Sequence, residues 1–232
     1  MGRIGIIGAM EEEVLALKSK INLTEVRGIA SLEFYVGSLN GREVVVVRGG
    51  IGKVNAAICT QLLIDCFQID AVINTGVAGA LSDELEIGDI VISDDAVQHD
   101  VDATSFGYER GYIPRMKESF FKADHNLVHI AEKASGVLSV QIKVYVKRIL
   151  SGDQFISSIA KKQELIKVFG GFCTEMEGAA VAHTCYVNQI PFVIIRSISD
   201  KADDSAEINF NEFAQLAAAN SSMMLEKMMT YL

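Results

Sequence analysis

The stretch Pro191–Asp204, PFVIIRSISDKADD, combines a buried-strand pattern with ionisable side chains. Residues 192–195 are apolar and mostly β-branched, which is typical of a strand that is covered on both faces. Arg196 and Asp200 follow this run. In open α/β sheets, ligands bind beyond the carboxyl ends of strands, so Asp200 is a candidate for chemistry on a substrate. A helix cap or a turn would explain Asp200 equally well, and this stretch leaves both readings open.

Short apolar runs alternate with helical patterns along the rest of the chain, which predicts an α/β fold. Further strands are expected at residues 3–9, 34–39, 43–48, 71–74, 88–97, 141–150 and 172–176, and helices at 10–20, after 53, at 125–133 and 158–168, after 177 and from 210 onward. Asn40-Gly41 predicts a tight hairpin, so the sheet should be mixed. We expect a three-layer α/β/α sandwich around a central mixed sheet. No Pro/Gly/Ser-rich linker divides the chain, so residues 1–232 should form a single domain.

Composition and charge narrow the classes of partner. The formal net charge is −9 and Lys and Arg are not clustered, which argues against a nucleic-acid partner. No apolar run approaches the ~18 residues of a membrane span, and Met1 leads directly into a short strand pattern without a secretory leader. The four cysteines form no CxxC pair, which favours free thiols in a reducing compartment. We therefore expect a cytoplasmic protein without a membrane partner.

Three acidic residues, Glu13, Glu177 and Asp200, each follow an apolar strand pattern, and three strand ends of one sheet can face one cleft. Structural alternatives exist, because acids in a first helical turn complement the helix dipole and a glutamate can cap a helix. The four histidines are scattered, and neither a metal-ligand cluster nor a Ser/His/Asp nucleophile motif competes with these acids. Carboxylates acting alone suit cleavage of a glycosidic bond, in which one protonates the leaving group and another activates water.

Eight motifs spread over almost the whole chain carry a family resemblance. In order they are GIIGAMEEEV, GGIGKVNAA, INTGVAGAL, GDIVISDD, FGYERG, SGDQFI, EMEGAAVAH and RSISDKAD. With these motifs the chain resembles the bacterial 5′-methylthioadenosine/S-adenosylhomocysteine nucleosidases of the purine nucleoside phosphorylase superfamily. The resemblance implies the fold of that superfamily and hydrolysis of the N9–C1′ bond of 5′-thioadenosines and 5′-deoxyadenosine. Neither a metal nor an organic cofactor is implied.

The resemblance also implies a role for individual residues. Asp200 would protonate or hydrogen-bond N7 of adenine with Ser199 beside it, and Glu13 would hold the attacking water with Arg196 fixing it from behind. Glu177 would bind the ribose hydroxyls. The remaining implied substrate contacts are Phe155 and the Ile156 backbone at adenine, Met176 and Glu175 near the sugar, and Met10, Ile51 and Phe210 at the ribose and 5′-thio group. The small-residue run Val77, Ala78 and Gly79 allows close packing against a flat ligand, and a tight strand-to-loop turn would explain it equally well.

An aromatic loop, FGYERGYIP at residues 106–114, suits either a lid or a subunit contact. In the similar enzymes this loop crosses a dimer interface. The resemblance therefore implies a homodimer in which Phe106 and Pro114 cover the thio-substituent in the partner's site.

The chain departs from the family pattern at Val77, where many relatives carry a small hydroxyl residue, and at Gly178-Ala179, where an Ala-Thr pair is more usual. Both departures are expected close to the sugar, so they bear on substrate preference. The alternatives are a phosphate-dependent purine nucleoside phosphorylase, an aminodeoxyfutalosine nucleosidase and a nucleoside-binding protein without catalysis. The acids at residues 11–13 argue against the phosphorylase, because a phosphate dianion beside carboxylates is unfavourable.

Overall fold

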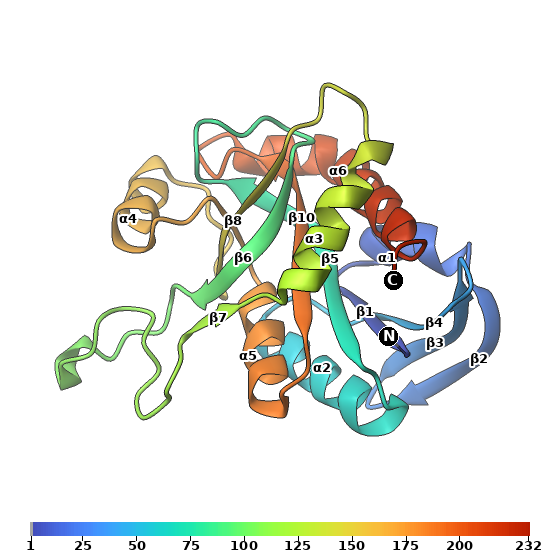
Figure 1. The fold of residues 1–232 in the computed structure, drawn as a ribbon. Coiled ribbons are helices and arrows are strands. Elements are labelled where there is room, and N and C mark those ends of the chain that lie inside the picture. Colours follow the sequence, from blue (N-terminus) through green and yellow to red (C-terminus); the bar gives the residue numbers. More distant parts are fainter. Residues whose placement is uncertain (1) are drawn as a thin grey trace.

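The computed structural model describes residues 2–232, which form one mixed sheet with helices on both faces (Figure 1). The strands are β1 (Ile4–Gly8), β2 (Asn22–Ile29), β3 (Leu32–Leu39), β4 (Arg42–Arg48), β5 (Ala71–Ala80), β6 (Ile90–Gln98), β7 (Phe120–Lys122), β8 (Val144–Ser151), β9 (Cys173–Glu175) and β10 (Phe192–Asp200). The α-helices are α1 (Glu11–Lys18), α2 (Lys53–Phe67), α3 (His125–Ala134), α4 (Ile159–Phe169), α5 (Gly178–Asn188) and α6 (Ala206–Met228), and short 3₁₀ turns occupy Thr104–Phe106 and Ser135–Val137.

The sheet runs in the order β10-β6-β8-β9-β5-β1-β4-β3-β2, with β7 paired to β6. Strand β10 also pairs in parallel with β5, so β5, β10, β6, β8 and β9 form a closed ring of neighbours. Strands β1, β4, β3 and β2 extend the sheet outward from β5. Closure removes the free edges of the ring and brings the carboxyl ends of β5 and β10 together.

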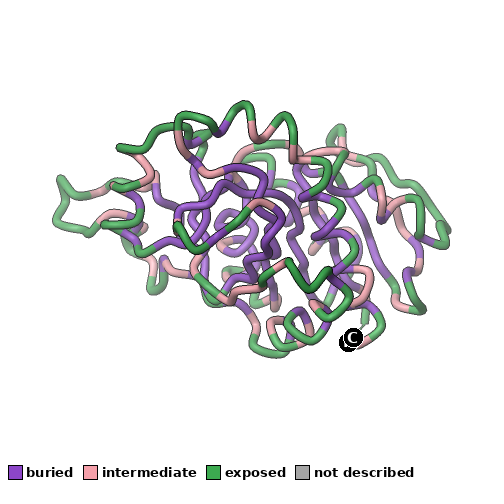
Figure 2. The backbone as a smooth tube through the Cα atoms, turned by 90° about the horizontal axis from the view of Figure 1, so that it is seen from above, coloured by how far each residue is buried: buried purple, intermediate pink, exposed green. Residues whose placement is uncertain are grey.

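Two apolar clusters fill the space between the sheet and its two helical layers. One contains side chains of α2 and α5 and the other contains side chains of α1, α3 and α6, so the two helix groups cover opposite faces of the sheet (Figure 1). In Figure 2 the buried backbone lies at the centre and the exposed segments surround it. The predicted three-layer α/β/α arrangement with a mixed sheet is confirmed.

The predicted hairpin is also present. Strands β3 and β4 pair antiparallel, with Leu39 opposite Arg42, and only Asn40 and Gly41 connect them. Both connecting residues have positive φ, 50° for Asn40 and 81° for Gly41, as the tight hairpin turn requires.

Four strands differ from the sequence prediction. Strand β7 was not predicted, because three residues are too few to show a strand pattern. Strand β5 continues to Ala80 where a strand of residues 71–74 followed by a loop was expected, and all ten residues of β5 are buried. Strand β10 continues to Asp200, so this carboxylate belongs to the strand itself and does not follow it in a loop. Strand β2 was not predicted, because it is an exposed edge strand without an apolar face. Small side chains at residues 75–80 allow β5 to pair closely with β10 and β9.

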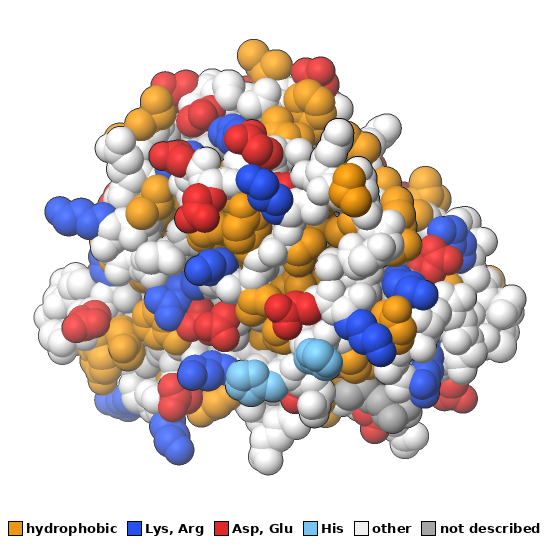
Figure 3. Space-filling view, turned by 45° about the horizontal axis from the view of Figure 1, so that its top comes forward, with side chains coloured by type: hydrophobic (Ala, Val, Ile, Leu, Met, Phe, Trp, Pro, Cys, Tyr) orange, Lys and Arg blue, Asp and Glu red, His pale blue; other side chains and the backbone are white. Residues whose placement is uncertain are grey.

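Within the described residues, every helix is too short or too polar to cross a bilayer. On the face drawn in Figure 3, basic and acidic side chains are interspersed, so this face has no continuous basic surface of the kind that nucleic acid requires.

Candidate active site

A cavity of about 380 Å³ opens at the carboxyl ends of β1, β5 and β10, beside the short strand β9. Its lining side chains come from segments far apart in the sequence: Ala9, Met10, Glu13, Ile51, Val77, Ala78, Gly79, Phe155, Thr174, Glu175, Met176, Glu177, Ser199, Asp200 and Phe210. The cavity thus collects the predicted acids around one space. None of these lining residues is basic.

Glu13 lies in the first turn of α1 and its carboxylate points back over the end of β1 onto β5. Its Oε2 accepts hydrogen bonds from the backbone N–H of Ala9 at 2.6 Å and of Met10 at 3.0 Å, and its Oε1 accepts one from Val77 N–H at 3.0 Å. Burial raises the pKa of Glu13, while the Arg196 guanidinium and these three amides oppose the rise. The protein thus supplies compensating donors for a buried carboxylate.

Arg196, near the middle of β10, is fully buried and pairs directly with Glu175 through Nε and Nη2. Its Nη2 also donates to Asn74 Oδ1 at 2.7 Å and lies 3.9 Å from Glu177. The expectation that Arg196 fixes Glu13 from behind stays a prediction, and the hydrogen bonds of Arg196 go to Glu175 and Asn74. Arg196 acts on Glu13 through its charge. Its Nε and Nη2 are oriented by Glu175 and Asn74, and its buried Nη1 has no hydrogen-bond partner among the described residues.

Gly76 explains how Arg196 and Glu13 approach each other. A Cβ atom at this position would overlap both Glu13 Oε1 and Arg196 Nη1. Only glycine leaves room for the two side chains at this point of β5. The sequence showed Gly76 as one of several small residues, and the pattern did not reveal this particular role.

Glu177 precedes helix α5, and its Oε1 accepts a hydrogen bond from the Gly52 N–H at 2.8 Å. Burial and the neighbouring Glu175 raise the pKa of Glu177 to about 8. Gly52 has a φ of 95°, a conformation that favours glycine, so the glycine-rich segment before α2 brings a backbone amide to this carboxylate.

Asp200 ends β10, and its surroundings differ from those of Glu13. Its Oδ2 accepts from the Ser199 hydroxyl at 2.9 Å and its Oδ1 from the Ala202 N–H at 2.8 Å. Burial raises the pKa of Asp200, and these two hydrogen bonds oppose the rise. The expected pairing of Ser199 with Asp200 is present.

Apolar and aromatic side chains form the rest of the wall. Phe155 and Phe210 meet edge to face with their ring centroids 5.8 Å apart. Met10 and Phe210 also pack against Val77, Ala217 and Ala218. This arrangement offers a flat apolar surface beside the carboxylates, which suits a ligand that carries an aromatic ring.

Two comparisons bear on this geometry. The family model of the phosphorylase superfamily matches residues 3–230. A relative from Staphylococcus aureus named 5′-methylthioadenosine/S-adenosylhomocysteine nucleosidase is 47% identical over 231 residues, covering 99% of this chain and 100% of that protein. The chain belongs to the phosphorylase superfamily and, within it, to the 5′-methylthioadenosine/S-adenosylhomocysteine nucleosidase family.

Solved structures agree with this membership. The nucleosidase of this family from Neisseria meningitidis, in complex with methylthio-immucillin-A, superposes with a TM-score of 0.96 at 39% identity and covers 100% of both chains. A futalosine hydrolase from Helicobacter pylori superposes with a TM-score of 0.94 at 33% identity, covering 100% of this chain and 98% of that one. The fold expected from the resemblance is thereby confirmed.

Three of the predicted substrate contacts, Ile156, Phe106 and Pro114, do not line the cavity. The Ile156 side chain packs into an apolar cluster with Leu165 and Phe169 of α4, which leaves its backbone as the group that can face a ligand. Phe106 is 83% exposed and Pro114 is also exposed, on the loop between β6 and β7 that projects from the body (Figures 1 and 2). Neither Phe106 nor Pro114 reaches the cavity of its own chain.

Two cavity residues were absent from the sequence prediction. Ala9 supplies one of the amides that hold Glu13, and Thr174 lies beside Glu175. The buried Thr174 hydroxyl has no hydrogen-bond partner among the described residues. A hydroxyl next to an acidic residue at a strand end was the available sequence signal for Thr174.

The two departures from the family pattern occupy different places. Val77 lines the cavity and donates its N–H to Glu13. Gly178 and Ala179 do not line it: the Gly178 N–H donates to Glu175 at 2.7 Å and the Ala179 N–H to Ser151 Oγ at 2.6 Å. Only Val77 can contact a ligand through its side chain.

Proposed function

We propose that this chain hydrolyses the N-glycosidic bond of 5′-methylthioadenosine, S-adenosylhomocysteine and 5′-deoxyadenosine, releasing adenine. The observation that carries this proposal is the pair of buried carboxylates, Glu13 and Asp200, over one strand. Glu13 accepts a hydrogen bond from Val77, and a Cβ at Gly79 would lie 2.7 Å from Asp200 Oδ1. Val77 and Gly79 are two residues apart on β5, a separation of about 7 Å along a strand.

The two carboxylates thus meet β5 at different positions, so a ligand that lies along this strand can contact both of them. Glycosidic bond hydrolysis uses two carboxyl groups on different sides of the bond, one at the leaving group and one at the water. In our proposal Asp200 supplies a proton or a strengthening hydrogen bond to N7 as the base departs. Glu13 holds and deprotonates the water that attacks C1′.

The remaining site residues bind and stabilise. Glu177 is placed by the Gly52 amide to accept ribose hydroxyls, with Met176 beneath the sugar. Phe155 stacks on adenine, the Ile156 backbone reads its edge, and the small residues 77–79 let the ligand approach β5. In the proposed mechanism Glu13 is ionised beside C1′, and its negative charge stabilises a cationic, oxocarbenium-like transition state.

Phosphorolysis is the main alternative, and the charges at the cavity argue against it. Arg196 is the nearby cation, but it is fully buried and already pairs with Glu175. No basic residue lines the cavity, so a phosphate dianion beside C1′ would face carboxylates without a cation on the cavity wall.

The test is adenine release from 5′-methylthioadenosine by the purified protein in phosphate-free buffer and with added phosphate, with Asp200→Asn and Glu13→Gln as controls. We expect a rate that is independent of phosphate and that both variants reduce strongly. A requirement for phosphate would establish the phosphorylase instead, and a wild-type protein as inactive as its variants would establish binding without catalysis. Aminodeoxyfutalosine belongs in the same substrate panel, because a futalosine hydrolase shares the fold.

We also propose a homodimer in which the Phe106 to Pro114 loop covers the partner's site. Its support is the exposed Phe106 on a projecting loop, together with exposed Val54 and Ile58 of α2 and Val187 of α5, which line one surface depression. Apolar side chains gathered in this way are typical of subunit contacts. Sedimentation of the wild type and of a Val54→Lys variant tests the proposal, since a monomeric wild type would contradict it.

Two further proposals concern the whole chain. We propose that residues 1–232 fold as one domain, which is supported by a sheet that includes strands from both halves of the chain. We propose a cytoplasmic location, which is supported by the four free cysteines, three of them buried.

A further inference from the structure

A surface groove continues from the mouth of the active-site cavity along α1. Ala9, Met10 and Ile51 line both the cavity and this groove. Farther along, the groove merges with a depression of about 440 Å³ between α1 and the β2–β3 hairpin. The two share Glu11, Ala30, Ser31, Leu32 and Arg48. A ligand that fills the cavity can therefore extend past Met10 and Ile51 toward charged side chains.

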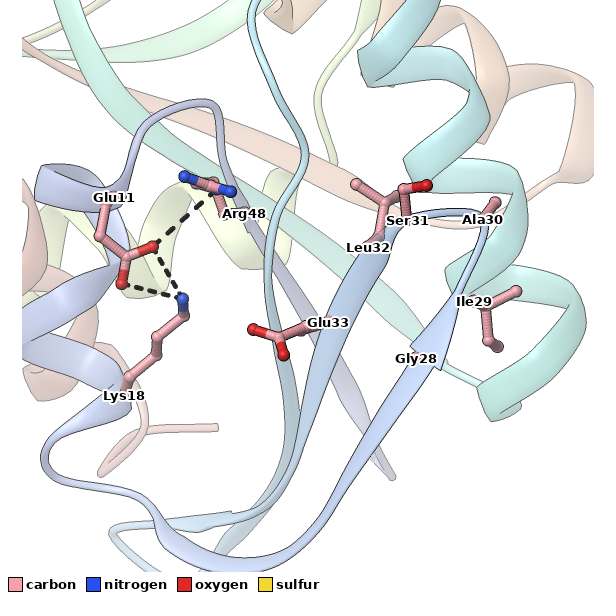
Figure 4. Close-up of a pocket in the computed structure, with 9 residues that line it drawn as sticks. All are labelled: Glu11, Lys18, Gly28, Ile29, Ala30, Ser31, Leu32, Glu33 and Arg48. Atoms are coloured by element: carbon pink, nitrogen blue, oxygen red, sulfur yellow. Dashed lines mark hydrogen bonds and ion pairs between the residues drawn. The ribbon is translucent and has the colours of Figure 1, made fainter.

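Arg48, the last residue of β4, stands in this groove with an uncommitted guanidinium (Figure 4). Its side chain is 60% exposed, and its one ion-pair contact within residues 2–232 is to Glu11 at 4.0 Å. None of its guanidinium N–H groups makes a hydrogen bond to the described residues. Figure 4 shows Glu11 on one side of Arg48 and the Ala30–Ser31 turn on the other.

Among the charged side chains of the groove, one carboxylate and one guanidinium remain available to bind a ligand. Lys18 Nζ donates to both carboxylate oxygens of Glu11, at 3.0 and 2.9 Å, so these two side chains neutralise each other. Glu12 is exposed, lines the groove next to Met10, and has neither a hydrogen bond nor an ion pair from its carboxylate within the described chain. Glu12 and Arg48 are thus a separated negative and positive charge beside the mouth of the cavity.

We propose that this groove binds the α-amino acid end of a zwitterionic 5′-thioadenosine substrate, as in S-adenosylhomocysteine. Arg48 binds the α-carboxylate, because its planar guanidinium can donate two parallel hydrogen bonds to it, and Glu12 accepts from the α-ammonium group. The proposal rests on the nucleosidase function proposed above. It assigns Arg48 and Glu12 to the discrimination between charged and uncharged 5′-substituents.

The position of the groove predicts which kinetic constant should change when Arg48 or Glu12 is replaced. Both charges lie outside the cavity that holds the carboxylates, so they bind the tail equally in the ground state and in the transition state. Removing such an interaction raises KM and leaves kcat unchanged. The solvent exposure of Arg48 limits the effect to about 3- to 5-fold for one charge pair.

The experiment compares Arg48→Ala with Arg42→Ala, which removes the same side chain at the opposite end of β4. Each is assayed on S-adenosylhomocysteine, on 5′-methylthioadenosine, and on 5′-butylthioadenosine, which has a comparably long but uncharged tail. We expect Arg48→Ala to raise KM about 3- to 5-fold for S-adenosylhomocysteine alone, and Arg42→Ala to change no substrate. Glu12→Gln should act in the same direction as Arg48→Ala, and added salt should weaken the wild-type preference for the charged tail.

Equal effects of Arg48→Ala on all three substrates, or no effect on S-adenosylhomocysteine, would overturn the assignment. An effect of Arg48→Ala on the butyl compound as large as that on S-adenosylhomocysteine would also overturn it, because the contact would then be apolar. Failure of the proposed nucleosidase function has a separate signature, since wild-type protein would then release no adenine from 5′-methylthioadenosine.

Discussion

Two carboxylates of one cavity, Glu13 and Asp200, have similar burial but different partners. Glu13 accepts three backbone N–H bonds and lies near a buried guanidinium. Asp200 accepts one N–H and one O–H, and no Arg side chain is among its hydrogen-bond partners in the described structure. Burial raises the pKa of both, but the donors that favour the ionised form are concentrated around Glu13.

In the mechanism proposed above, this difference divides acid and base work between two side chains that carry the same functional group. Carboxylates take separate roles when their environments separate the energies of their charged forms. Strand β5 sets both environments, because Val77 binds Glu13 and Gly79 leaves space for Asp200. The predictions below change one side of this comparison at a time.

The largest effect is expected from Asp200→Asn. The amide keeps the size of the side chain but has one acceptor oxygen where the carboxylate uses two, so it keeps only one of the hydrogen bonds from Ser199 and Ala202, and it cannot deliver a proton to N7. We expect kcat on 5′-methylthioadenosine to fall by at least ~10²-fold. Steady-state kinetics measure this fall, and thermal unfolding serves as the folding control. A variant that keeps most of its kcat would remove Asp200 from catalysis.

Glu13→Gln should come next, with a fall in kcat of about 10²-fold, because a glutamine cannot take a proton from the attacking water. Wild-type activity should decline as the pH falls through the pKa of Glu13, which burial holds above its ordinary value of 4.5. A pH profile of kcat measures both effects. If the residual activity of Glu13→Gln declined at low pH in the same way as the wild-type activity, the decline would belong to another group.

Gly76→Ala should reduce kcat by roughly 10-fold. The added methyl group would overlap Glu13 Oε1 and Arg196 Nη1, so the base would be displaced while Asp200 stayed in place. Gly28→Ala is a matched control, because an added Cβ there meets nothing within 4 Å. Equal kcat values for the two variants would show that the position of Glu13 is not sensitive to this contact.

Ser199→Ala should have the smallest effect, a loss of about 5-fold or less, corresponding to one hydrogen bond. The Ser199 hydroxyl stabilises ionised Asp200 and lowers its pKa, so the variant should hold the proton to higher pH. The alkaline limb of the kcat profile should therefore move to higher pH. A shift to lower pH would contradict the assignment of Asp200 as the proton donor.

The sequence predicted much of this site because the acids follow recognisable strand patterns. Asp200 and Glu13 were identified from apolar runs that end in ionisable residues, and Asn40-Gly41 predicted the hairpin correctly. The family motifs supplied the expected roles of the aromatic and small residues, and the structure brings most of them to one cavity.

Other features depend on contacts that a local pattern does not contain. The partner of Arg196 is decided by the distant residues Glu175 and Asn74, which strand pairing brings beside it. The closed ring of strands requires β10 to pair with both β5 and β6. Strand β2 lacks the apolar alternation by which strands are recognised, since seven of its eight residues are exposed.

The most direct test of the division between Glu13 and Asp200 uses a leaving group that needs no proton. The substrate is the 4-nitrophenyl glycoside of 5-methylthioribose, and the release of nitrophenolate is compared with the release of adenine from 5′-methylthioadenosine. We predict that Asp200→Asn loses most of its activity on the adenine substrate and retains it on the nitrophenyl substrate, whereas Glu13→Gln loses both. Equal losses for Asp200→Asn on the two substrates, or a Glu13→Gln variant that still cleaves the nitrophenyl compound at the wild-type rate, would contradict the account.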